Sequence, residues 1–181
     1  MALRYALLGL LSKEPSTGYE LAQRFKETMT HFWTAHHTQI YRELGKMEKE
    51  ELVSSKIIHQ EEYPDKKIYS IESKGYEDLI QWLARDTVGQ PKLKDEQLMR
   101  VSLFHLISSK EAITYLNKTK KLHTDGLAFM ERWKRLNFPD EKVPKQELGE
   151  YLTLEYGMRY MKNWIEWCDW AIEVLEKFDE E

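Results

Sequence analysis

The sequence predicts a mainly α-helical fold with one small β-hairpin, organised in two domains. Apolar residues recur at helical spacing through most of the chain, and two short segments rich in β-branched residues, 53–60 and 66–71, flank a run of turn residues. A loop with Gly89 and Pro91 follows, after which the pattern is helical to the end. We therefore expect an N-terminal domain over residues 1–88 and a helical C-terminal domain over residues 89–181.

The composition is that of a globular protein without covalent or metal staples. Of 181 residues, 41% are hydrophobic and 32% are charged, and the net charge is -4. Because the chain is acidic as a whole, any DNA-binding surface must be a local basic patch. One cysteine excludes an internal disulfide and a CxxC metal motif, and we expect no cofactor and no metal. No apolar run is long enough to span a membrane, which predicts a cytoplasmic protein.

The N-terminal domain begins with two predicted helices. Residues 3–11 are almost wholly apolar, with Ala and Leu dominating, and Pro15 ends that segment. Thr17 and Glu20 have the spacing of a capping box, which predicts a helix over residues 17–29.

A third helix, ending near residue 51, is predicted to have two distinct faces. Ile40, Leu44 and Met47 form an apolar stripe, whereas the opposite face is polar. The polar face starts at the helix N-terminus, where backbone N–H groups and the helix dipole favour phosphate. The predicted hairpin follows, and Ser73 is expected to cap a helix over residues 73–85.

Three helices, a hairpin and a fourth helix form the outline of a winged helix-turn-helix, in which the third helix enters the major groove. Thr38 and Gln39 are candidates for base contacts, because Gln pairs with adenine and Thr with several bases. Phosphate contacts are assigned to the remaining polar residues of the helix and to the wing. These residues are Tyr41, Arg42 and Lys46, with His36 and His37 assisting, and Lys66 and Lys67 in the wing.

The C-terminal domain is predicted to hold three helices. One is expected over residues 98–107, a second opens with the capping box of Ser108 and Glu111 and ends before Pro139, and the last spans about residues 145–178. In the last helix, apolar residues alternate at spacings of three and four, which is typical of a coiled-coil seam. We expect this seam and the neighbouring tryptophan to form a dimer interface, comprising Leu154, Met158, Met161, Trp164, Ile165, Cys168, Ile172 and Leu175.

Several motifs together resemble the PadR family of transcriptional regulators. They are YALLGLL at 5–11, STGYEL at 16–21, FW at 32–33, TQIYREL at 38–44, and KIYSI at 67–71 with Gly75. The long helical tail resembles the larger PadR subfamily, so the resemblance covers nearly the whole chain. It implies a homodimer that represses a nearby promoter and is released by a small molecule, and it places Tyr19 among the DNA-contacting positions.

Phenolic acid repressors resemble this chain most, which suggests an aromatic acid as the effector. We expect such a ligand between the two domains, near Leu8, Met99 and Tyr151, with Arg4 as the cation.

Two other classes of protein are the alternatives. An enzyme lacks support, because the sequence has no HExxH, GxSxG, P-loop or GxGxxG motif. An adaptor protein remains open, since heptads and tryptophans mark interfaces whatever the partner is.

Overall fold

The computed structural model describes residues 2–29, 32–59, 65–85 and 95–178. The chain forms two compact units, residues 1–89 and 90–181. The first unit is a helical bundle with a small sheet, and the second is entirely helical in its described part. The predicted fold class, mainly α with a small β element, is confirmed. Among the described residues, no helix is both long and apolar enough to cross a membrane.

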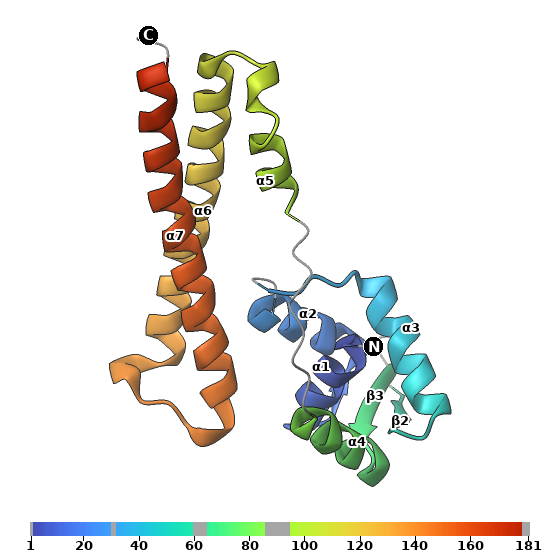
Figure 1. Ribbon diagram of the computed structural model, residues 1–181. Helices are drawn as coiled ribbons and strands as arrows, with labels where there is room; N and C mark the ends of the chain where they lie inside the picture. The colour runs from blue at the N-terminus through green and yellow to red at the C-terminus, as the bar shows by residue number, and fades with distance from the viewer. Residues whose placement is uncertain (1, 30–31, 60–64, 86–94, 179–181) are drawn as a thin grey trace. The chain divides into compact units, whose positions relative to one another are not determined.

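The first unit is built around α1 (Ala2–Leu11), which contacts α2 (Gly18–Met29), α3 (His37–Lys49) and α4 (Ser73–Ala84) (Figure 1). Leu7 and Leu8 of α1 are fully buried, and Leu21, Ile40 and Leu44 complete the centre of this core. The apolar stripe predicted for the third helix is therefore confirmed as its buried face. This packing leaves the polar face of α3 toward solvent.

The sheet has three strands, one more than the predicted hairpin. Strand β2 (Val53–Ile58) pairs antiparallel with β3 (Lys66–Ile71), and β1 (Ser16–Thr17) covers the other edge of β3. Sequence patterns do not reveal a two-residue strand, because its pairing with Ile68 and Tyr69 is set by tertiary contact. The predicted capping box is present beside it: Glu20 N–H donates to Thr17 Oγ1, and Thr17 N–H donates to the Glu20 carboxylate.

Helix α4 lies close to the turn that leads into β2. A Cβ atom at Gly75 would come within 2.1 Å of the Leu52 carbonyl oxygen, so only glycine fits there. The Glu72 N–H donates to that same carbonyl at 3.0 Å. Ser73, predicted as the cap, is instead the first helical residue, and Glu72 holds the cap position without a side-chain hydrogen bond.

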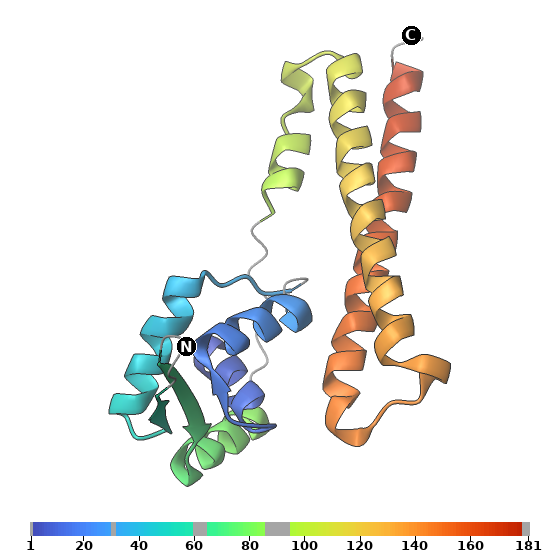
Figure 2. The same ribbon diagram turned by 180° about the vertical axis from the view of Figure 1, so that it is seen from behind.

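The second unit consists mainly of two long antiparallel helices that lie side by side in both views (Figures 1 and 2). They are α6 (Ser109–Asn137) and α7 (Leu148–Phe178), connected through the short 3-10 helices η2 (Pro139–Glu141) and η3 (Lys145–Glu147). The capping box of Ser108 and Glu111 opens α6 as predicted. The helix expected over residues 98–107 is wrong: the chain forms α5 (Glu96–Val101) and then η1 (Phe104–Leu106).

A buried histidine fastens α5 to the helix pair. His123 of α6 stacks on Trp164 of α7 with ring centroids 5.0 Å apart, and its Nε2 lies 3.2 Å from Oε1 of Gln97 in α5. Beside it, the Tyr160 hydroxyl lies 3.5 Å from Oδ2 of Asp95, whose other oxygen accepts the Gln97 and Leu98 N–H groups. Burial lowers the pKa of His123 below its ordinary value.

Candidate nucleic-acid interface

The polar face of α3 presents most of the predicted DNA-contacting residues together. Its exposed side chains comprise His37, Thr38, Gln39, Tyr41, Arg42 and Lys46. In the described part of the chain, neither Arg42 nor Lys46 forms a side-chain ion pair. One helix face thus offers donors, acceptors and two cations to solvent, as contact with base edges and phosphates requires.

Gln39 caps the N-terminus of α3, in addition to its predicted contact with a base. Its Oε1 accepts the backbone N–H of His36 at 2.9 Å, which closes the first turn of α3. The oxygen keeps a second lone pair, and the side-chain NH₂ group can donate. Gln39 can therefore cap the helix and still present both a donor and an acceptor to a base.

Tyr41 is held in place from two sides. Its ring lies against His37 with centroids 4.6 Å apart, and a Cβ atom at Gly18 would approach its Cε1 to 2.6 Å. Glycine at the first position of α2 is thus what allows the tyrosine ring to approach. Partial burial raises the pKa of the Tyr41 hydroxyl. Tyr19, the next residue of α2, is largely exposed.

The two wing lysines differ, although they are adjacent in sequence. Lys66 is exposed. Hydrogen bonds from Thr17 lower the pKa of the Glu20 carboxyl in α2, and the positive charge of Lys66 adds to this lowering. Lys67 donates from Nζ to Glu48 Oε2 of α3 at 2.8 Å and lies over the Tyr69 ring, 5.1 Å from its centroid. Sequence reasoning missed Glu48, because its partner Lys67 lies 19 residues away and no local pattern links the two.

The four residues expected to bind a ligand are divided between the two units, and each is described within its own unit. Arg4 donates to Glu43 at 3.1 Å and to both oxygens of Glu50 at 2.8 and 3.0 Å, so its guanidinium is committed to α3. Leu8 is fully buried in the core of the first unit. In the second unit, Met99 lies on α5, which contacts the middle of α6 through Gln97 and His123, whereas Tyr151 lies in the first turn of α7, against Phe138.

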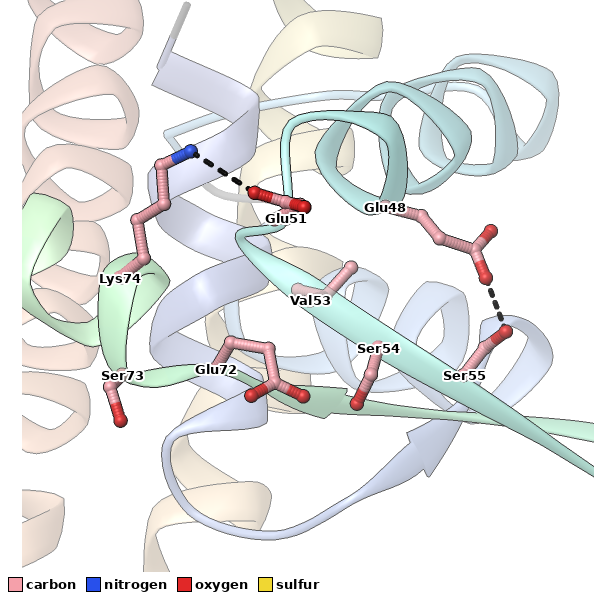
Figure 3. Close-up of a pocket in the computed structure, with 8 residues that line it drawn as sticks. All are labelled: Glu48, Glu51, Val53, Ser54, Ser55, Glu72, Ser73 and Lys74. Carbon is pink, nitrogen blue, oxygen red and sulfur yellow. Dashed lines mark hydrogen bonds and ion pairs between the residues drawn. The ribbon is translucent and has the colours of Figure 1, made fainter.

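A shallow groove beside the wing is also a poor site for an aromatic acid. Figure 3 shows its lining, in which Glu48, Glu51 and Glu72 supply three carboxylates. Lys74 is the basic residue that lines it, and its ammonium already interacts with Glu51 at 3.9 Å and with the Glu50 carbonyl at 2.8 Å. Three negative charges disfavour an anionic ligand there.

The heptad seam of α7 packs largely within its own chain. Leu154 and Met158 form a buried cluster with Met130 and Phe138, while Trp164 and Cys168 pack on Leu116 of α6. These four side chains are therefore covered by residues of their own protomer. The other four, Met161, Ile165, Ile172 and Leu175, are half-buried. Within the protomer, the periodic apolar seam of α7 packs against α6.

The side chains left exposed on the helix pair form a second apolar set. On α7 they include Leu152, Tyr156 and Trp170, which at 3.6 residues per turn lie opposite the buried seam. On α6 they are Leu122, Phe129 and Leu136, spaced by seven residues. The exposed fractions are 65% at Tyr156 and 60% at Trp170, so these two large side chains leave much apolar surface uncovered within the protomer.

Comparison with known proteins agrees with this architecture. Residues 7–81 match the model of the transcriptional regulator PadR-like family, and residues 93–176 match that of the virulence activator alpha C-terminal region. The negative transcriptional regulator PadR of Bacillus subtilis is 28% identical over 97% of this chain and 98% of its own. A probable transcriptional regulator of Mycobacterium tuberculosis is 32% identical over 98% and 99% of the two chains.

Solved structures show the same likeness over nearly the full length. The crystal structure of Bacillus subtilis PadR with operator DNA has a TM-score of 0.86 at 27% identity, and that with p-coumaric acid has 0.77. The virulence activator AphA of Vibrio cholerae has 0.76 at 26% identity. Each of these covers 97% of this chain and 99% of the other.

The helix-helix-helix-wing unit, with the polar face of α3 exposed, defines a winged helix-turn-helix transcriptional regulator. Full-length identity of 32% to a regulator and the match of residues 7–81 specify the family. The chain belongs to the PadR-like family of transcriptional regulators, which are not enzymes.

Proposed function

We propose that the protein binds an operator in double-stranded DNA through the polar face of α3 and represses the adjacent promoter. The observation that carries the proposal is the exposed face with Thr38, Gln39, Arg42 and Lys46, which no other element in the described part of its unit covers. Such a regulator works in the bacterial cytoplasm, where the chromosome lies.

The cations of the α3 face and of the wing predict how DNA binding responds to salt. The chain carries a net charge of -4, so attraction to DNA comes from the cations of the α3 face and the wing. Each phosphate neutralised by a cation makes the slope of log K against log salt concentration more negative by about 0.9. Affinity should therefore fall steeply with salt although the protein is acidic.

The relatives support repression and point to a second mode. The Bacillus subtilis relative is a negative regulator solved with operator DNA, whereas AphA is an activator. Activation is therefore the second candidate. A promoter fused to a reporter, with and without the protein, separates the two by the direction of the change.

We also propose that the DNA-bound form is a homodimer held by the exposed apolar side chains of α6 and α7. A second copy is the occupant that fits, because the α6 set recurs every seven residues, as in helix-to-helix packing. Charge supports pairing of α6 with the partner's α7: Lys118 and Arg132 flank the α6 set, and Glu166 and Glu173 flank the α7 set.

A small aromatic acid is the proposed effector. The support is the relative solved with p-coumaric acid, together with its likeness over nearly the full length of both chains. The proposal concerns the class of ligand, since Arg4 and Leu8 are committed to packing within the first unit.

The test is binding to DNA fragments upstream of the protein's own gene and its neighbours, measured by fluorescence anisotropy at several salt concentrations. We expect sequence-specific binding that p-coumarate or ferulate weakens. An adaptor protein would bind none of the fragments, which would overturn the proposed function. Unchanged affinity at millimolar p-coumarate and ferulate would reject the effector class alone.

A further inference from the structure

One carboxylate joins the recognition helix to both strands of the wing. Glu48 lies in the last turns of α3, and its Oε2 accepts from Lys67 Nζ of β3 at 2.8 Å. Its Oε1 accepts from the Ser55 hydroxyl of β2, as the dashed line in Figure 3 shows. Within the described residues, α3 is thus tied to the wing by side-chain hydrogen bonds at this carboxylate.

Strand geometry explains why only one wing lysine takes part. Successive side chains of a strand point to opposite faces, so Lys67 and Tyr69 share the face of β3 toward α3, and Lys66 lies on the other. Ser55 pairs directly with Tyr69 in the register of the hairpin, which puts it on the same face as Lys67. Lys66 and Lys67 therefore lie on opposite faces of β3, and only Lys67 faces α3.

The charges at this junction satisfy one another. The hydrogen bond from Lys67 lowers the pKa of Glu48, and the same bond raises the pKa of Lys67, so both stay charged at neutral pH. The ammonium also lies over the buried ring of Tyr69. A phosphate would have to compete with both partners for Lys67.

We propose that Glu48 is a positioning residue for DNA binding, which holds the wing against α3 through Lys67 and leaves Lys66 as the wing lysine that contacts phosphate. The inference rests on the proposed binding of DNA. Lys67 then has a structural role and Lys66 contacts phosphate, whereas two adjacent basic residues would ordinarily both contact phosphate.

A purely electrostatic role for Glu48 and a positioning role predict opposite changes in DNA affinity when Glu48 is neutralised. If Glu48 were only a negative charge near DNA, its neutralisation would free Lys67 and tighten binding. If Glu48 positions the wing, neutralisation loosens the wing and weakens binding. The sign of the change in affinity therefore separates the two roles.

The experiment compares matched pairs of full-length variants in operator binding across a range of salt concentrations. Glu48→Gln is matched with Glu51→Gln, an exposed carboxylate on the adjacent turn, and Lys67→Met is matched with Lys66→Met. Lys67→Arg tests rescue by a side chain that keeps the ion pair. Circular dichroism and thermal unfolding verify that each variant is folded.

We expect Glu48→Gln and Lys67→Met each to weaken binding about two- to fivefold at every salt concentration, the range of a partly exposed ion pair. Their salt slopes should match that of the wild type, and Lys67→Arg should bind as the wild type does. Lys66→Met should reduce the slope by about 0.9, and Glu51→Gln should not weaken binding.

Two results would overturn the inference: tighter or unchanged binding by Glu48→Gln, or a slope reduced by about one unit in Lys67→Met. Failure of the proposed function looks different, because the wild-type protein itself would then bind no operator fragment.

Discussion

At the scale of single residues, side chains on the DNA-facing surface serve the fold and the proposed contact together. Gln39 accepts the backbone N–H of His36 while its NH₂ group remains free to donate. Tyr41 packs against Gly18 and His37 while part of its ring stays exposed. A substitution at Gln39 or Tyr41 changes both the stability of the fold and the proposed DNA contact. A second variant that changes only one of these properties is therefore needed.

Gln39 can be tested in this way. Gln39→Ala should relax operator preference and also lower helix stability by about 1 kcal/mol, since the cap is lost. Gln39→Glu keeps an acceptor for the His36 N–H but cannot donate to adenine, so it should lose preference without losing stability. Binding to operator variants and thermal unfolding are the measurements. Wild-type preference in Gln39→Glu would remove this residue from base reading.

At the scale of elements, local sequence fixed most helix ends, and distant contacts fixed the exceptions. The capping boxes at Thr17 and Ser108 start their helices where the sequence predicts. The N-terminal turn of α5 is held against the helix pair by Gln97 and Asp95, whose partners lie 26 and 65 residues away in the sequence. No periodicity over residues 98–107 contains that information.

The attachment of α5 should be sensitive to acid. The neutral His123 donates from Nε2 to Gln97, while its Nδ1 faces the Met161 sulfur at 3.1 Å, a poor acceptor for a second proton. Asp95 and Tyr160 are the titratable groups at this junction. Because the pKa of His123 is lowered from 6.5 in the folded state, the unfolded chain binds the proton first.

Stability should therefore fall as the pH drops from 6.5 toward the lowered pKa of His123, and this loss should be absent above 6.5. Thermal unfolding of the wild type and His123→Gln over this range measures it, and the variant should lose less stability on acidification. His105→Gln is the matched control, because that histidine is exposed. Equal acid sensitivity of wild type and His123→Gln would contradict the assignment.

At the scale of the whole molecule, the proposed regulator needs two copies to read two half-sites. The exposed residues Tyr156 and Trp170 of α7 are the places where a partner has most to cover. Half-sites should then be spaced by about 10 base pairs or a multiple, one turn of the duplex.

Tyr156→Glu and Trp170→Glu should convert the protein to a monomer at micromolar concentration, because a buried unpaired carboxylate is costly. Light scattering after size-exclusion chromatography gives the mass directly. Glu176→Lys, which alters charge on α7 at an exposed position away from the apolar set, is the control and should leave the dimer intact. Dimers in all three variants would exclude this surface as the interface.

The sequence by itself determined the order of the main helices and the two hairpin strands, the two-sided character of α3 and the likeness to the family, because these depend on local periodicity and short motifs. Tertiary structure alone decided that Lys67 and Arg4 are bound by carboxylates of α3, that β1 joins the sheet, and that the α7 seam packs on α6. Helical spacing shows that a stripe must be buried, but the neighbour that buries it is chosen by how distant segments pack.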